Sequence, residues 1–247
     1  MEYGVGAIST AEGSATVKLG GTSVVAGSNI RAVLPGGVGN EKTVQVVLEL
    51  GSICSTRFQS NKQCEEAAAL SKTITRIVSN AVDRVDLTIN ENIFWDIRVS
   101  VFCTSFDGNV LDAALFAAVL CLMNTKLPNV ALNPSGELSE TNKPSKYLRL
   151  QSIPISHTFA MLDCDNQLLN LADPTAMEED SARSLVTIVV VARSAGEESA
   201  AHVGSAPIVV HKPGGISLQP AHLSSAIKAA RARAQQVLTL MRADLVP

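Results

Sequence analysis

The chain contains few charged and few aromatic residues. Of its 247 residues, 17% are charged, 4% are aromatic and one is a tryptophan. The 20 Lys and Arg residues are outnumbered by 23 Asp and Glu residues, giving a net charge of −3. This balance excludes a globally basic, histone-like mode of nucleic-acid binding and leaves only a local basic patch. No apolar run approaches the roughly 20 residues that span a bilayer. Since 46% of residues are hydrophobic, we expect subunit contacts to cover the surplus apolar surface, and no membrane partner.

Cysteine and histidine patterns give no sign of a metal site. The five cysteines are an odd number without a Cys-x-x-Cys pair, so neither a disulfide framework nor a zinc site is expected. The four histidines are scattered, and no cofactor or metal ligand is predicted. No secretory signal is recognised at the start of the chain. Small thiols of this kind are typical of a reducing, intracellular compartment.

The order of apolar patterns predicts an α+β fold. Alternating or glycine-bounded runs indicate strands, and spacings of three and four indicate helices. No linker is visible, so we expect one domain over residues 1–247, with two halves of similar outline. Strands are expected at 4–10, 13–19, 22–33, 43–50, 85–89, 93–103, 146–152, 157–162, 167–171, 185–192 and 207–211, and helices at 63–82, 108–125 and 220–243. Polar loops are expected at 134–145 and, as a mobile insertion, at 194–206.

Two cations lie on the outer face of the first predicted helix. Lys72 and Arg76 are four residues apart, on the side opposite the apolar face, so they are adjacent and exposed. A solvated helix face, with Glu65 nearby, explains this spacing. A ladder that follows a phosphate backbone explains it too, and spacing alone favours the solvated face.

Two further segments can be interpreted either as functional sites or as ordinary loops, turns or helix starts. The acidic run Glu178, Glu179 and Asp180 has the residue types of a metal or acid–base site, but also those of a solvated loop or a helix start. The glycine-rich segment Pro35–Asn40 lacks the Gly-Lys-Ser/Thr ending of a phosphate loop and is read as a turn.

Several stretches, taken in order, resemble one known family. They are Gly6–Ala32, Ile53–Ser71, Phe106–Pro128, Ala172–Asp180 and His211–Gly215. Together they are similar to the RNase PH-like subunits that build the six-membered ring of the RNA exosome core, and most similar to a eukaryotic subunit without an active site. The resemblance implies the RNase PH-like fold, in which two βαβα-type halves form one compact domain.

The departures from the catalytic members imply a chain without an active site. Active members have a Gly-Gly-Ser/Thr-Arg segment at the start of the buried helix, where the hydroxyl and guanidinium hold phosphate. The matching stretch here is Gly108-Asn109-Val110-Leu111, and leucine has no donor. Active members also have an acid six positions after the last acid of the Glu-Glu-Asp run, and here that position is Val186. No catalytic residue is therefore expected.

The same resemblance assigns the cations a role. In the archaeal non-catalytic partner, basic residues at the positions of Lys72 and Arg76 line the channel and touch the RNA backbone. Arg57, in the loop before the helix, is a weaker candidate, and Ser79 replaces a third basic position. The family usually begins with a helix and an Arg-x-Asp-Gly-Arg-like stretch. This chain starts almost at the first strand, so we expect that helix to be absent.

The resemblance also implies partners and a location. These are the other RNase PH-like subunits of a heterohexameric ring, the RNA-binding cap subunits, an associated hydrolytic nuclease and single-stranded RNA, in the nucleus, including the nucleolus, and in the cytoplasm. An active phosphate-dependent 3'-5' exoribonuclease is the first alternative, and Leu111 speaks against it. A small-molecule enzyme on a related two-layer α+β fold is the second, and the missing phosphate loop speaks against it.

Overall fold

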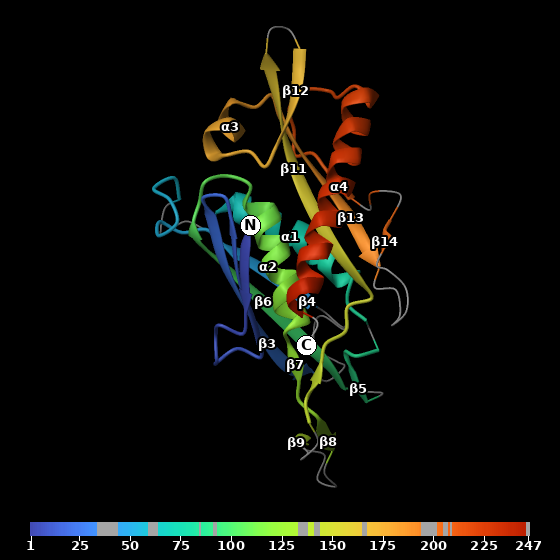
Figure 1. Ribbon diagram of the computed structural model, residues 1–247. Helices are drawn as coiled ribbons and strands as arrows, with labels where there is room; N and C mark the ends of the chain where they lie inside the picture. Colours follow the sequence, from blue (N-terminus) through green and yellow to red (C-terminus); the bar gives the residue numbers. More distant parts are fainter. Residues whose placement is uncertain are drawn as a thin grey trace.

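The protein consists of two sheets with a buried helix between them (Figure 1). The computed structural model describes residues 1–33, 44–58, 64–83, 85–90, 93–132, 138–140, 144–164, 167–193, 202–204, 207 and 209–245. Strands and helices are mixed along the chain, which confirms the expected α+β class. No helix of this described part is long and apolar enough to cross a membrane.

The first sheet has the order β1-β2-β3-β6-β4, with β5 paired to the end of β6. All neighbours are antiparallel except β4, which runs parallel to β6. The β2–β3 hairpin closes through Gly20 and Gly21, as predicted, with Gly20 at a φ of 57° that glycine adopts readily. The strands are β1 Glu2–Val5, β2 Gly13–Leu19, β3 Thr22–Val33, β4 Val44–Glu49, β5 Thr88–Asn90 and β6 Ile93–Ser105.

The second sheet has the order β12-β11-β13-β14, with β15 on the same side of β13 as β14, and all its pairs are antiparallel. Two short ladders, β7–β10 and β8–β9, lie outside both sheets. The strands are β7 Lys126–Leu127, β8 Val130–Leu132, β9 Leu138–Glu140, β10 Lys146–Tyr147, β11 Ser152–Cys164, β12 Gln167–Ala172, β13 Ser184–Arg193, β14 His202–Val203 and β15 Val209–His211.

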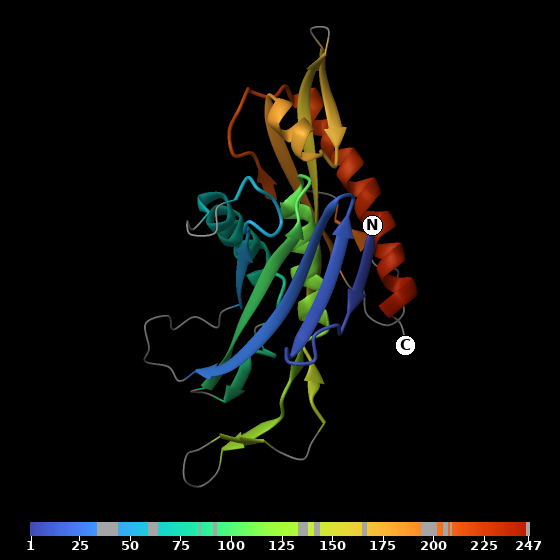
Figure 2. The ribbon, with the colours of Figure 1, turned by 90° about the vertical axis from the view of Figure 1, so that its left-hand side faces the viewer.

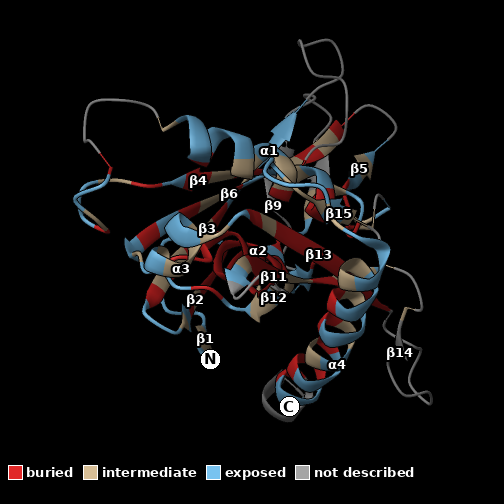
Figure 3. Cartoon of the chain, turned by 90° about the horizontal axis from the view of Figure 1, so that it is seen from above, coloured by how far each residue is buried: buried red, intermediate tan, exposed pale blue. Residues whose placement is uncertain are grey.

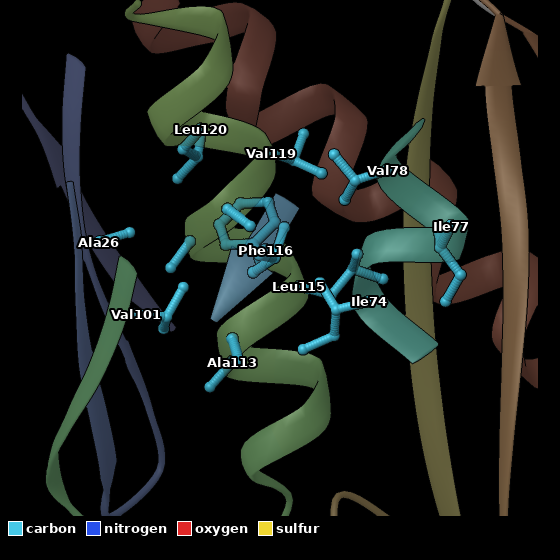
Figure 4. Packing of buried hydrophobic residues seen from close by; sticks show 14 of the residues in the cluster. Ala26, Ile74, Ile77, Val78, Val101, Ala113, Leu115, Phe116, Val119 and Leu120 are labelled. Carbon is cyan, nitrogen blue, oxygen red and sulfur yellow. The ribbon is translucent and has the colours of Figure 1, made fainter. Parts of the chain in front are cut away.

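Helix α2, Val110–Met123, forms the centre of the core. It contacts β2, β3 and β6 of the first sheet, β11 of the second sheet and helix α1, Glu65–Ser79. Thirteen of its residues are buried, because apolar side chains surround the helix on every side. Figure 4 shows Leu115 and Val119 facing Ile74 and Val78 of α1, and Figure 3 shows α2 buried at the centre of the molecule.

The remaining helices lie at the edge of this core. Helix α4, Pro220–Leu245, packs against β11 and β13 with a buried stripe that includes Ala230, Ala234, Leu238 and Met241 (Figure 3). Helix α3, Ala176–Ser181, is a short turn beside the start of α2 and has no buried residue.

Some predicted boundaries were wrong. The strand expected at 157–162 begins at Ser152, because residues 153–156, Pro154 included, continue its pairing with β13. Conversely, the strand expected at 146–152 is reduced to β10. The loop expected at 134–145 contains β9, a strand too short for its pattern to be recognised. The insertion expected at 194–206 includes β14, and apart from residues 202–204 it lies outside the described residues. The segment Pro35–Asn40 also lies outside them.

Candidate functional site

The start of α2 is closed by the segment that leads into α3. Gly108 has a φ of +86°, and a Cβ atom there would lie 2.6 Å from the backbone of Pro174, Thr175 and Ala176. The backbone N–H of Ala176 donates to the carbonyl of Asp107 across this junction. Only glycine permits such close contact at a positive φ. The sequence motif around Gly108 thus fixes how the two halves meet.

A carboxylate of the chain itself occupies the start of α2. The backbone N–H of Asn109 donates to Glu179 Oε1 at 2.8 Å. Burial raises the pKa of Glu179 and the neighbouring charges of Glu66 and Asp180 raise it further, while Asn109 and Arg57 lower it. Helix starts attract anions through their free N–H groups. At this one, the attraction is directed to an internal carboxylate.

The two positions that the family resemblance matches to the phosphate ligand and the catalytic acid are apolar and buried. Leu111 lies in the first turn of α2 and is 6% exposed, and Val186 lies on β13 and is fully buried. Neither side chain can donate to phosphate or hold a proton. The structure therefore places no phosphate-binding or acidic group at these two positions.

Of the acidic run, Glu178 is explained by local structure. Its carboxylate accepts from the backbone N–H and the hydroxyl of Thr175, a capping box that starts α3. These hydrogen bonds lower the pKa of Glu178. The plainer reading, a helix start, is correct for this residue. No cluster of three or more possible metal ligands occurs among the residues that the structure describes.

Arg57 lies among the acidic side chains. It is 3.3 Å from Asp180 and 3.9 Å from Glu66, and its guanidinium carbon lies 5.9 Å from the centre of the Phe106 ring. We call Glu66, Glu179 and Asp180 around Arg57 the acidic surface. One cation among three carboxylates leaves this surface negative, so Arg57 is already engaged by charges of its own chain.

Lys72 and Arg76 lie in a different setting. Both are exposed on α1, and neither forms an ion pair within the described part of the chain. Burial lowers the pKa of His211, on β15 of the second half, and the nearby charge of Arg76 lowers it further. We call Lys72 and Arg76 the basic surface, and His211, whose lowered pKa favours the neutral ring, lies beside it. Sequence reasoning identified the two helix positions but missed His211, because nothing local connects β15 with α1. Figure 2 shows both elements on the same side of the molecule.

The free cysteines that the structure describes are Cys54, Cys64, Cys103 and Cys121. Burial raises the pKa of Cys103 to about 12, helped by Cys54, and burial raises that of Cys121 to about 12. Thiols with such pKa values are poor nucleophiles at neutral pH. Their role here is packing.

Comparisons with known proteins agree on one family. Residues 1–128 match the model of the 3' exoribonuclease family, domain 1 (RNase PH), and residues 152–233 match domain 2. The exosome complex component Rrp42 of Methanosarcina mazei is 30% identical over 93% of this chain and 79% of its own length. That of Pyrococcus furiosus is 32% identical over 76% of this chain and 68% of its own.

Solved structures show the same fold. The exosome of Archaeoglobus fulgidus with RNA bound to the active site contains a chain of 27% identity that aligns over 96% of this chain and 87% of its own, with a TM-score of 0.72. A chain of an archaeal exosome core aligns over 96% and 83%, with 26% identity and a TM-score of 0.71. The expected RNase PH-like fold is confirmed. These named relatives are archaeal, so the expected likeness to a eukaryotic subunit stays a prediction.

Proposed function

Because the chain belongs to the 3' exoribonuclease family of RNase PH domains, we propose that it is a structural subunit of an exosome ring that serves 3'-5' RNA processing and decay without catalysis of its own. The relatives that span most of the chain are named as exosome components, and its structural neighbours are exosome cores, one of them with RNA bound. In this reading, the chain completes the ring and forms part of the wall of its RNA channel.

One observation carries the non-catalytic part of the proposal. At the start of α2, Glu179 accepts the Asn109 N–H, while Leu111 and Val186 fill the two positions matched to phosphate ligand and acid. Inorganic phosphate would have to displace a carboxylate and enter a negative surface in which the Arg57 guanidinium is already paired with Asp180 and Glu66. Phosphate and the carboxylates of this surface carry charges of the same sign, which disfavours binding. Phosphorolysis therefore has neither its anchored nucleophile nor its acid.

The basic surface supports the RNA-binding part. Lys72 and Arg76 are exposed and free of ion pairs within the described residues, so both charges are available to a phosphate backbone. Arg57 contributes less, because Asp180 and Glu66 already neutralise it.

We propose a finer assignment on the stretches that carry the family resemblance. The chain is a eukaryotic ring subunit, the one that the family nomenclature numbers forty-three, and forms one domain over residues 1–247. Its partners are the other RNase PH-like ring subunits, the RNA-binding cap subunits and an associated hydrolytic nuclease. Its location is the nucleus, including the nucleolus, and the cytoplasm.

The test separates a structural subunit from a phosphorolytic enzyme. The full chain is purified alone and co-expressed with a catalytic RNase PH-like partner, and each sample is incubated with single-stranded RNA and inorganic phosphate. We expect nucleoside diphosphates from the co-expressed complex only, and a stable 1:1 complex in sedimentation. Leu111→Arg should not confer activity, since Val186 still supplies no acid. Diphosphate release by the lone chain above a heat-inactivated control would establish the enzyme instead.

A further inference from the structure

A cavity of about 340 Å³ lies between α2, the start of β11 and α4. Helix α2 and its N-cap residue contribute Asn109, Asp112, Ala113 and Phe116, which follow the spacing of one helix face. Leu111 and Leu115 lie on the opposite face of α2, where Leu115 packs toward α1 (Figure 4). Leu111, the position matched to the phosphate ligand, is therefore not part of the cavity lining.

The inner wall of the cavity contains a hydrogen-bond acceptor without a partner. Asn109 is 4% exposed, and its Oδ1 atom is buried without a hydrogen bond to any described residue. Its Nδ2 group donates to Asp173 Oδ1 at 2.6 Å, which fixes the orientation of the amide. A buried acceptor left unpaired costs stability. The cost would be recovered if a bound group donated to this oxygen.

Backbone strain concentrates at the same pair. Asn109 and Asp173 have φ values of 47° and 57°, and they are the non-glycine residues with positive φ in the described part of the chain. Such conformations persist where the surrounding structure enforces them, and they are common at binding sites. Asp173 is exposed and also lines the cavity, so its carboxylate is reachable from solvent.

Two carboxyl groups, those of Asp112 and Asp173, are among the polar groups of the cavity. The buried Asp112 carboxylate already accepts from the backbone N–H of Thr158 at 2.7 Å and from its hydroxyl at 3.0 Å. His157 also lines the cavity, and burial lowers its pKa, which keeps the ring neutral near pH 7. Arg233 is the cationic side chain of the lining, which also includes Met1, and its guanidinium donates to Gln236 on its own helix at 3.3 Å. Apolar side chains, among them Val17, Leu19 and Phe116, form the rest of the wall.

We propose that this cavity binds an amidinium or guanidinium group on an apolar stem, with Asn109 Oδ1 and the Asp173 carboxylate as acceptors. A planar cation with several N–H donors pairs well with a carboxylate and a neighbouring amide oxygen. The apolar wall suits the stem, as in ligand sites where few polar groups orient a mostly apolar ligand. The exposed Asp173 carboxylate disfavours an anion, whereas burial raises the pKa of Asp112. This inference does not depend on the function proposed above.

The first test uses p-aminobenzamidine, whose fluorescence increases in an apolar site, with the full chain. We expect saturable binding at millimolar concentration or below, and no competition by benzoate, which has the same shape and a negative charge. Asp173→Asn keeps the shape and tolerates the positive φ, and should weaken binding by about tenfold. Asp163→Asn, at an exposed aspartate that pairs with Arg183 outside the cavity, is the matched control and should leave binding unchanged.

A variant that is expected to strengthen binding controls for a folding defect. Arg233→Met removes the competing cationic side chain of the lining, so it should strengthen p-aminobenzamidine binding, whereas a loss of structure would weaken it. Circular dichroism of each variant verifies folding. Stronger binding of benzoate than of the amidinium, or equal binding to the Asp173→Asn and Asp163→Asn variants, would overturn the proposal.

Displacement of the bound dye distinguishes the two sources of such a group. Agmatine represents a free small molecule, and a blocked Gly-Arg-Gly peptide represents an arginine side chain of another protein. Displacement by agmatine assigns a small cationic ligand. Displacement by the peptide alone assigns a protein side chain. If neither displaces the dye, the guanidinium class is wrong.

Discussion

The basic and acidic surfaces use the same residue types in opposite ways. Arg76 and Arg57 are both surface arginines. Arg76 has no ion-pair partner among the described residues, whereas Arg57 is held by Asp180 and Glu66. Helix α1 contributes to both surfaces, since Glu66 lies in its first turn and Arg76 in its last, an order that suits the helix dipole. Whether a surface arginine can bind an external anion thus depends on whether carboxylates of its own chain lie beside it.

The largest expected effect comes from Gly108→Ala, which breaks the junction that holds the acidic surface together. The new Cβ would meet the backbone of Pro174, Thr175 and Ala176 at 2.6 Å, at a φ that disfavours alanine. We expect a loss of about 3 kcal/mol in the free energy of unfolding, measured by urea denaturation.

Gly20→Ala is the matched control for this change. Gly20 also has a positive φ, but no atom lies within 4 Å of the position of its Cβ. Its loss should be about 1 kcal/mol, from the backbone conformation alone. Equal losses for the two variants would show that the contact with the α3 segment is not tight.

The second effect sharpens the role of the basic surface. Lys72→Glu combined with Arg76→Glu should weaken the binding of single-stranded RNA by the assembled ring about tenfold. If each cation neutralises one phosphate, the negative slope of log affinity against log salt should become shallower by about 1.4. Lys18→Glu with Lys228→Glu makes the same charge change at exposed lysines on β2 and α4. An unchanged slope relative to this control would identify Lys72 and Arg76 as an ordinary solvated helix face.

The third effect concerns the pH dependence of the acidic surface. Folding raises the pKa of Glu179 chiefly by burial, so its contribution to stability is complete below the unfolded pKa, about 4.3, and is lost as pH rises through the folded value. Glu179→Gln removes this loss while its amide oxygen still accepts the Asn109 N–H.

We therefore expect the Gln variant to be more stable than the wild type at pH 8, by a few tenths of a kcal/mol once solvent screening is included. The advantage should disappear as pH falls toward 4, in parallel urea titrations. Glu178→Gln, at a carboxylate whose pKa is lowered, should show the opposite pH trend. Parallel pH profiles for the two variants would contradict this account of Glu179.

The smallest effect is expected for Arg57→Ala. Its ion pairs are exposed, and such pairs contribute about 0–1 kcal/mol to stability. RNA affinity should stay within about twofold of the wild type, because Asp180 and Glu66 already neutralise the Arg57 charge. A loss as large as that of the Lys72 and Arg76 variant, in the same binding assay, would place Arg57 on the RNA path and erase the contrast between the two surfaces.

Some elements were predictable because their pattern is local. The β2–β3 hairpin matches its prediction to the residue, since two glycines separate two β-rich runs and leave one register. Helix α1 shows the outward position of Lys72 and Arg76 because the 3.6-residue period is fixed. Strand β9 was missed because three residues carry too little pattern, and its pairing with β8 is set by its surroundings.

The sequence by itself determined the α+β class, the central apolar helix and the apolar residues at positions 111 and 186, all of which follow from side-chain type and spacing along the chain. Only the tertiary structure decided what meets across the two halves. It brought Glu179 to the Asn109 N–H, joined Asn109 to Asp173 beside a cavity and placed His211 near Arg76. These contacts join residues tens of positions apart, so they depend on how two sheets pack around α2, which no local pattern encodes.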